Sequence, residues 1–151
     1  MNKTLKILNG QKFLHTKVKS PKIIRVTAAI LEKDDKILIA QRKSENDLFG
    51  GLWEFPGGKI ERDETPEECM ARELNEELNI EVEVGELVTS NKHKYSHGIF
   101  ELLAYKVKHI SGKFILNDHD EIKWVTIYEL SNFEFPPADI PIINYLKHSN
   151  D

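Results

Sequence analysis

Three glutamates near the middle of the chain, Glu73, Glu76 and Glu77, stand three and four residues apart. On a helix their side chains would share one face and converge on one region of space. Each like-charge pair at this spacing costs about 0.2–0.5 kcal/mol on an exposed helix, and more when it is partly desolvated. Arg72 can offset only part of this repulsion. Mg²⁺ or Mn²⁺ would relieve it, because hard cations prefer carboxylate oxygens and commonly share their coordination shell with substrate phosphates. A solvated acidic helix face is the alternative interpretation.

The surrounding residues predict a helix over 66–78. Thr65 can cap its start, Pro66 suits the first helical position, and Glu68 can complete a capping box. Asn79 can take the left-handed conformation that ends a helix. An apolar stripe that can pack on a sheet recurs every fourth residue and comprises Met70, Leu74 and Leu78.

The stretch from Gly58 to Ile80 resembles the Nudix box, G-x5-E-x7-R-E-U-x-E-E-x-G-U. Five residues lead from Gly58 to Glu64, seven more lead to Arg72-Glu73, and the remaining positions are filled by Leu74-Asn75-Glu76-Glu77-Leu78-Asn79-Ile80. Only Asn79 departs from the pattern, since the family has glycine there. Asn is the next-best residue for a left-handed helix end, so the departure is physically mild.

Other segments resemble the MutT-type branch of this family, which acts on nucleoside triphosphates. They are Gln41-Arg42, residues 52–59 (LWEFPGGK) and residues 135–141 (FPPADIP). The last of these is closer to the CTP pyrophosphohydrolase subgroup than to MutT itself, which would carry Asn in place of Asp139. This difference bears on the choice of base.

The resemblance implies a metal site made by the carbonyl of Gly57 with the carboxylates of Glu73, Glu76 and Glu77. It makes Glu64 a structural or outer-shell partner of that site. A P-loop interpretation of the glycines fails, because the required first Gly would fall at Trp53. A plain turn is the alternative for the glycine pair.

A fourth carboxylate is expected at Asp118, six residues before Trp124, where the family commonly places a Glu-His pair. An acidic loop is the alternative, and His119 either orients Asp118 or is simply exposed. The expected catalytic residues are Glu76, Asp118 and Arg72. Either Glu76 or Asp118 could accept the proton of the attacking water.

Four residues are the candidates for substrate binding: Arg42, Lys59, Phe135 and Asp139. A guanidinium suits bidentate phosphate contacts, although Arg42 could instead form a surface salt bridge. Among the aromatic residues of these motifs, Phe135 is favoured for the base pocket because it lies near Asp139. Asp139 can hydrogen-bond an exocyclic amine, or it can be the N-cap of the last helix.

Apolar runs predict five strands and a closing helix. The strands are expected at 23–31, 36–41, 80–88, 100–107 and 122–127, and the helix at 140–146. Helices on both sides of a mixed sheet follow from this pattern. The family resemblance likewise implies an α/β fold, a Nudix-type α/β/α sandwich with a mixed central sheet.

Length and charge bound the possible functions. One domain over residues 23–151 is expected, preceded by an N-terminal appendage, residues 1–22, that carries six lysines and no acid. Residues 5–8 of this appendage could form a short strand that pairs with the sheet or with another chain; a solvated basic tail is the alternative. The net charge of −4 argues against binding of duplex nucleic acid.

The lone Cys69 and the absence of a membrane-length apolar run favour a cytoplasmic protein without a membrane partner. A monomer or a homodimer is expected. The expected function is Mg²⁺- or Mn²⁺-dependent hydrolysis of a nucleoside triphosphate, of the CTP, dCTP or 8-oxo-dGTP type, to a monophosphate and pyrophosphate. Hydrolysis of another nucleoside diphosphate derivative and non-catalytic nucleotide binding are the alternatives.

Overall fold

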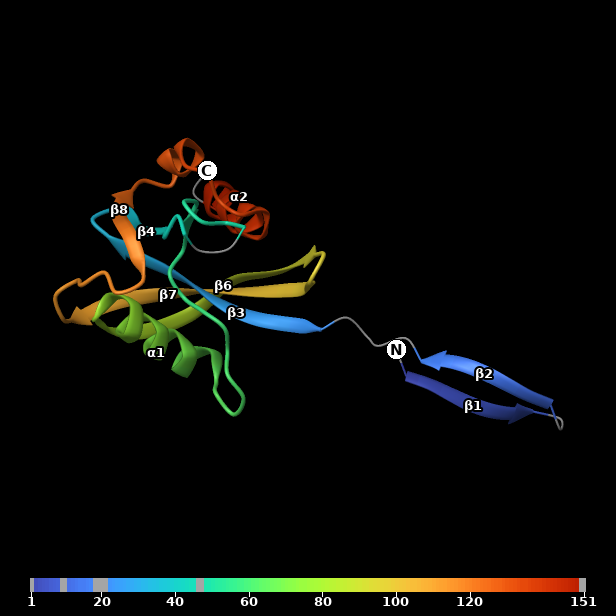
Figure 1. Cartoon of the computed structure of the whole chain (residues 1–151). Coiled ribbons are helices and arrows are strands. Elements are labelled where there is room, and N and C mark those ends of the chain that lie inside the picture. Colours follow the sequence, from blue (N-terminus) through green and yellow to red (C-terminus); the bar gives the residue numbers. More distant parts are fainter. Residues whose placement is uncertain (1, 9–10, 18–21, 46–47, 150–151) are drawn as a thin grey trace.

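The computed structural model describes residues 2–8, 11–17, 22–45 and 48–149. A six-stranded mixed sheet carries helix α1 (Pro66–Leu78) on one face and helix α2 (Ile140–Ser149) on the other (Figure 1). The predicted α/β/α sandwich with a mixed sheet is therefore confirmed.

The sheet has the order β5-β4-β3-β7-β6, with β8 paired to β4. Strands β3 and β7 run parallel, and the other pairs are antiparallel. The strands are β3 (Ile23–Lys33), β4 (Lys36–Arg42), β5 (Trp53–Glu54), β6 (Glu81–Tyr95), β7 (Gly98–Ser111) and β8 (His119–Val125).

Strand β3 lies at the centre and supplies side chains to both hydrophobic layers. Ala28 and Ile30 belong to the cluster beneath α2, whereas Ala29 and Leu31 belong to the cluster beneath α1. A strand covered on both faces is a continuous apolar run rather than an alternating one, as this one is. From the two helices, the clusters receive Met70, Leu74 and Leu78 of α1 and Ile142, Ile143 and Leu146 of α2.

Helix α1 has the ends that the sequence predicts. The Glu68 N–H donates to Thr65 Oγ1 over 3.1 Å, and the Thr65 N–H donates to Glu68 Oε1 over 3.2 Å, which completes the capping box. Asn79 ends the helix in the left-handed conformation, with φ 60° and ψ 29°. The helix that carries the glutamate cluster is thus fixed locally at both ends.

The structure differs from the sequence prediction at the edges of the sheet. Strand β6 continues through a polar stretch to Tyr95, because its ladder with β7 runs on to the pair Tyr95 and Gly98. Strand β8 starts three residues earlier than predicted, at His119. Two-residue β5 and the 3₁₀-helices η1 (Tyr128–Asn132) and η2 (Pro137–Asp139) are too short for a periodic signal, and the sequence did not predict them.

The predicted strand near residues 5–8 is present as β1 (Asn2–Leu8). It pairs with β2 (Gln11–Lys17) in a separate two-stranded sheet rather than with the central one. Its role as an appendage stays a prediction. No helix within the described residues is both long and apolar enough to cross a membrane.

Replacement of Leu74 by Ala tests the packing of α1 on the sheet. Leu74 is fully buried, so Leu74→Ala should lower the free energy of unfolding by about 2–5 kcal/mol, as measured by urea denaturation. Leu87→Ala is the matched control, because Leu87 is exposed. Equal losses in the two variants would contradict this description of the core.

Candidate active site

The glycine loop that follows β5 lies against β3. The Ala29 N–H donates to the Pro56 carbonyl (2.7 Å), and the Thr27 N–H donates to the Gly58 carbonyl (2.9 Å). A further bridge joins Val26 to Lys59. The loop therefore runs as a short extension of the sheet, and α1 packs on the same region.

Glycine is required at both loop positions by close contacts. A Cβ atom at Gly57 would lie 2.0 Å from the Thr27 carbonyl oxygen, and one at Gly58 would lie 2.3 Å from Glu73 Cδ. Real side chains do not approach so closely, so the loop backbone reaches the Glu73 carboxylate only because both residues lack a side chain. The role of the Gly57 carbonyl as a metal ligand remains a prediction.

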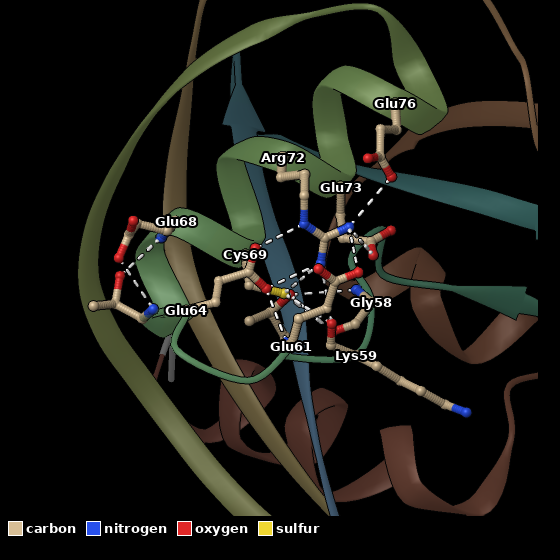
Figure 2. A network of polar contacts seen from close by, with 11 residues as sticks. Gly58, Lys59, Glu61, Glu64, Glu68, Cys69, Arg72, Glu73 and Glu76 are labelled. Atoms are coloured by element: carbon tan, nitrogen blue, oxygen red, sulfur yellow. Dashed lines mark hydrogen bonds and ion pairs between the residues drawn. The ribbon is translucent and has the colours of Figure 1, made fainter.

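Arg72 is the centre of a polar network between α1 and this loop (Figure 2). Its Nε donates to Glu64 Oε2 (2.7 Å) and its Nη2 to Glu64 Oε1 (3.0 Å), a bidentate pair. Its Nη1 donates to Glu73 (2.9 Å) and to Glu76 (3.3 Å), and its Nη2 also reaches the Lys59 carbonyl (3.2 Å). Arg72 thus holds the helix and the loop together.

Glu64 has the environment of a structural residue. Hydrogen bonds from Arg72 and from the Glu61 N–H lower the pKa of Glu64 to about 2. Its carboxylate is therefore committed to Arg72, in line with the outer-shell position that the family resemblance implied.

Glu77 is the buried member of the glutamate cluster. Burial raises its pKa far above the ordinary value, and the charge of Glu54 and the carboxylates of Glu73 and Asp118 raise it further. Within the part of the chain that the structure describes, Glu77 Oε2 has no hydrogen-bond partner. Buried carboxylates are normally paired, so this atom needs a proton or a cation.

Glu54 is a site residue for which the sequence reasoning proposed no role. Arg42 Nη1 donates to Glu54 Oε1 over 2.7 Å, and His119 Nε2 lies 3.0 Å from Glu54 Oε2. The strand register brings these three side chains together. Both β5 and β8 pair with β4, so that Glu54 is opposite Ala40 and His119 is opposite Arg42. A signal was available: the polar Glu54 stands between the buried Trp53 and Phe55, which is the alternation of a strand.

A cavity of about 660 Å³ brings most of the predicted residues together. Predicted residues in its wall are Arg42, Gly57, Lys59, Glu73, Glu77, Asp118 and Asp139. Glu54 and His119 also line it, so His119 is a buried wall residue rather than an exposed one. The side chain of Lys59 points away from Arg72 (Figure 2).

Two of the predicted catalytic residues lie outside this wall. Glu76 has a side chain that is 59% exposed and is held by Arg72. Arg72 itself contacts carboxylates of the loop and helix, which is the position of a residue that orients other side chains. Their predicted parts in catalysis are not tested by this geometry.

Phe135 is not among the residues that line the cavity. It is buried in the core under α2, where its ring lies 5.4 Å from that of Phe55. Phe55 lines the cavity instead. The 3₁₀-helix η2 separates Phe135 from the cavity residue Asp139 along the chain. The role of Phe135 at the base stays a prediction.

Asp139 is buried in the cavity wall at the end of η2. Burial raises its pKa to about 8, the charge of Glu54 raises it too, and Arg42 opposes the shift. Asp139 is the last residue of η2 and directly precedes α2, which begins at Ile140.

The carboxylates fit a divalent cation. Glu73 and Glu77 share a wall with Glu54 and Asp118, beside a loop whose backbone is in contact with Glu73. The unpartnered Glu77 oxygen needs a positive neighbour. Among the residues that the structure describes, no three His, Cys, Asp or Glu side chains lie close enough together to hold one metal ion. Arg72 donates hydrogen bonds to two of these carboxylates, Glu73 and Glu76.

An α/β/α sandwich with a glycine loop and a glutamate helix beside a nucleotide-sized cavity is the arrangement of Nudix hydrolases. Residues 26–145 match the family model described as NUDIX domain, and the chain belongs to the Nudix family. It is accordingly a hydrolase.

Relatives of known identity cover most of the chain. It is 43% identical to a CTP pyrophosphohydrolase of Escherichia coli over 81% of this chain and 90% of the relative. It is 35% identical to an 8-oxo-dGTP diphosphatase of Haemophilus influenzae over 83% and 92% of the two chains. The solution structure of the E. coli ORF135 protein aligns with a TM-score of 0.77 at 41% identity, covering 88% of this chain and 94% of that one.

Replacement of Glu77 by Gln tests the buried carboxylate. Glu77→Gln should reduce turnover by more than about 100-fold, because the amide is isosteric but carries no charge to hold a cation. The melting temperature should not fall, because glutamine is isosteric with the protonated glutamate that the metal-free protein buries. Glu121→Gln, at an exposed position, is the control and should keep full turnover. Full activity of Glu77→Gln would contradict the assignment.

The raised pKa of Asp139 predicts a pH dependence of stability. The folded state holds this proton more tightly than the unfolded state does. The stabilisation is therefore complete below the ordinary aspartate pKa of 3.8 and is lost as the pH rises towards about 8. Asp139→Asn should remove this loss, which has a slope of up to about 1.4 kcal/mol per pH unit. Urea denaturation of both proteins across this range measures it. Parallel stability curves would show that Asp139 titrates normally.

Proposed function

We propose that this chain is a nucleoside triphosphate pyrophosphohydrolase, which converts a nucleoside triphosphate and water to the monophosphate and pyrophosphate. The observation that carries the proposal is a single cavity that contains the carboxylates Glu73, Glu77 and Asp118 together with the buried Asp139. The three carboxylates Glu73, Glu77 and Asp118 suit a metal-bound polyphosphate, and Asp139 suits the nucleobase. Relatives named for CTP and 8-oxo-dGTP hydrolysis support it.

In this proposal, phosphate binding falls to the glutamates and to two basic residues. Mg²⁺ or Mn²⁺, when bound by Glu73, Glu76, Glu77 and the Gly57 carbonyl, would neutralise charge and acidify the attacking water. Arg42 is held by Glu54 in the cavity wall and Lys59 also lines the wall, so both can contact phosphate oxygens.

The reaction forms a bond between the water oxygen and phosphorus and breaks a phosphoanhydride bond. The proton of the water passes to a carboxylate, for which Glu76 and Asp118 are the candidates. Asp118 lies in the cavity wall, whereas Glu76 lies beside it on the exposed side of α1. Both assignments remain part of the proposal.

Base recognition is assigned to Asp139. As a carboxylate it accepts a hydrogen bond from an exocyclic amine, and when protonated it can donate one. Burial places its pKa near neutral pH, so both states are accessible. A base with an exocyclic amine, such as cytosine or 8-oxoguanine, fits this residue.

The proposed setting is the cytoplasm, with the protein as a monomer or a homodimer. A net charge of −4 favours a free nucleotide over duplex nucleic acid as the partner, and no membrane partner is proposed. The only cysteine of the sequence, Cys69, is buried beside Thr27 and is consistent with a reducing compartment.

A substrate panel tests the proposed reaction. CTP, dCTP, 5-methyl-dCTP, 8-oxo-dGTP, dATP and ADP-ribose are incubated with Mg²⁺, and the released pyrophosphate and phosphate are quantified. Triphosphates with an exocyclic amine should yield pyrophosphate, and EDTA should abolish the reaction until excess Mg²⁺ or Mn²⁺ is added. Faster cleavage of ADP-ribose than of every triphosphate, or release of single phosphates, would contradict the proposal.

A further inference from the structure

The backbone of Ala138, the residue before Asp139, is bound by strand β6 at both its N–H and its carbonyl. The Ala138 N–H donates to Tyr95 Oη over 3.0 Å, and Asn91 Nδ2 donates to the Ala138 carbonyl over 3.1 Å. Asn91 and Tyr95 are four residues apart on β6, so the alternation of the strand places both on one face. Both polar groups of one residue are therefore bound by one strand.

These two hydrogen bonds are important for holding this segment, because the backbone just before Ala138 has few N–H groups that can donate a hydrogen bond. Pro136 and Pro137 have no N–H, so Ala138 has the first free amide after Phe135. The next amide, of Asp139, closes the turn of η2 by donating to the Pro136 carbonyl. The two hydrogen bonds of Ala138 therefore connect the 3₁₀-helix η2 to strand β6.

Aromatic neighbours restrict the ring of Tyr95. The His97 ring stacks on it at 5.7 Å with an interplanar angle of 6°, and the Phe100 ring meets it edge-on at 5.4 Å. The rings of Phe49 and His93 lie 5.4 Å and 4.5 Å away. A ring packed in this way has a fixed hydroxyl, which makes it a rigid anchor for Ala138.

Tyr95 and Asp139 belong to one cavity and influence one another. Both line its wall, together with His97 and Phe100. Burial raises the pKa of Tyr95, the Ala138 N–H lowers it, and the charge of Asp139 raises it. Tyr95 is therefore a neutral phenol near neutral pH, and its oxygen remains available to accept the Ala138 bond.

We propose that Asn91 and Tyr95 are specificity-determining positioning residues, which fix the place where Asp139 meets the base by binding the N–H and the carbonyl of Ala138. The inference rests on the proposed function, in which Asp139 binds the base. Small displacements of a positioned group weaken recognition, and the phosphate site lies elsewhere in the cavity. Loss of the clamp should therefore affect base choice and KM rather than the chemical step.

Tyr95→Phe in the full chain is the direct test, because it keeps the packed ring and removes only the hydroxyl. The KM for the nucleotide hydrolysed fastest should rise about threefold to tenfold, the effect of one lost hydrogen bond, while kcat stays nearly constant. The preference for that nucleotide over its analogue without the amine, such as CTP over UTP or 8-oxo-dGTP over 8-oxo-dITP, should fall by a similar factor.

Two further variants make the outcome decisive. Asn91→Ala removes the other bond and should shift KM and base preference in the same direction, even if Tyr95→Phe folds poorly. Tyr128→Phe is the matched control, because Tyr128 is exposed and away from the cavity wall. A lower melting temperature with unchanged KM and base preference in both clamp variants would mean a merely structural role and would overturn the inference.

Asp139→Asn separates this inference from the proposed function. If Asp139→Asn leaves base preference unchanged, the assignment of Asp139 to the base fails, and the clamp inference falls with it. If Asp139→Asn alters base preference while Tyr95→Phe and Asn91→Ala do not, only the clamp inference is overturned.

Discussion

The buried carboxylate of Glu77 is the constraint around which the site is arranged. It lies among Glu54, Glu73 and Asp118, and burial and these charges together oppose its ionisation. An uncompensated charge in such a place is costly, so the protein must keep a proton there or bring in a cation. A cation that binds Glu77 must displace its proton into the solvent, so occupation of the site would depend on pH.

Two arginines neutralise the acids that surround Glu77. Arg72 binds Glu64, Glu73 and Glu76 on the side of α1, whereas Arg42 binds Glu54 on the side of β4. None of these four ion pairs involves Glu77. The fold thus neutralises the outer acids with basic side chains and leaves the inner carboxylate to face the cavity. The close approach of the glycine loop to Glu73 completes this arrangement.

Local signals predicted what depends on local structure. The capping box and the left-handed Asn79 fixed α1, and the spacing of its glutamates was enough to expect a shared patch. Glu54 could not be assigned in the same way, because its role arises from strand register, which brings Arg42 and His119 to it from distant segments. The packing of Phe135 against Phe55 could not be predicted either, because it joins segments far apart in the sequence and no periodic pattern reports it.

Ion binding by the protein without nucleotide tests the central claim most directly. Calorimetric titration with Mn²⁺ near neutral pH, repeated in two buffers of different ionisation enthalpy, measures binding and proton release together. The account predicts saturable binding that releases about one proton per site, because Glu77 is protonated before the cation binds, and no such release from Glu77→Gln. Absence of saturable binding, or binding without proton release by the unaltered protein, would contradict it.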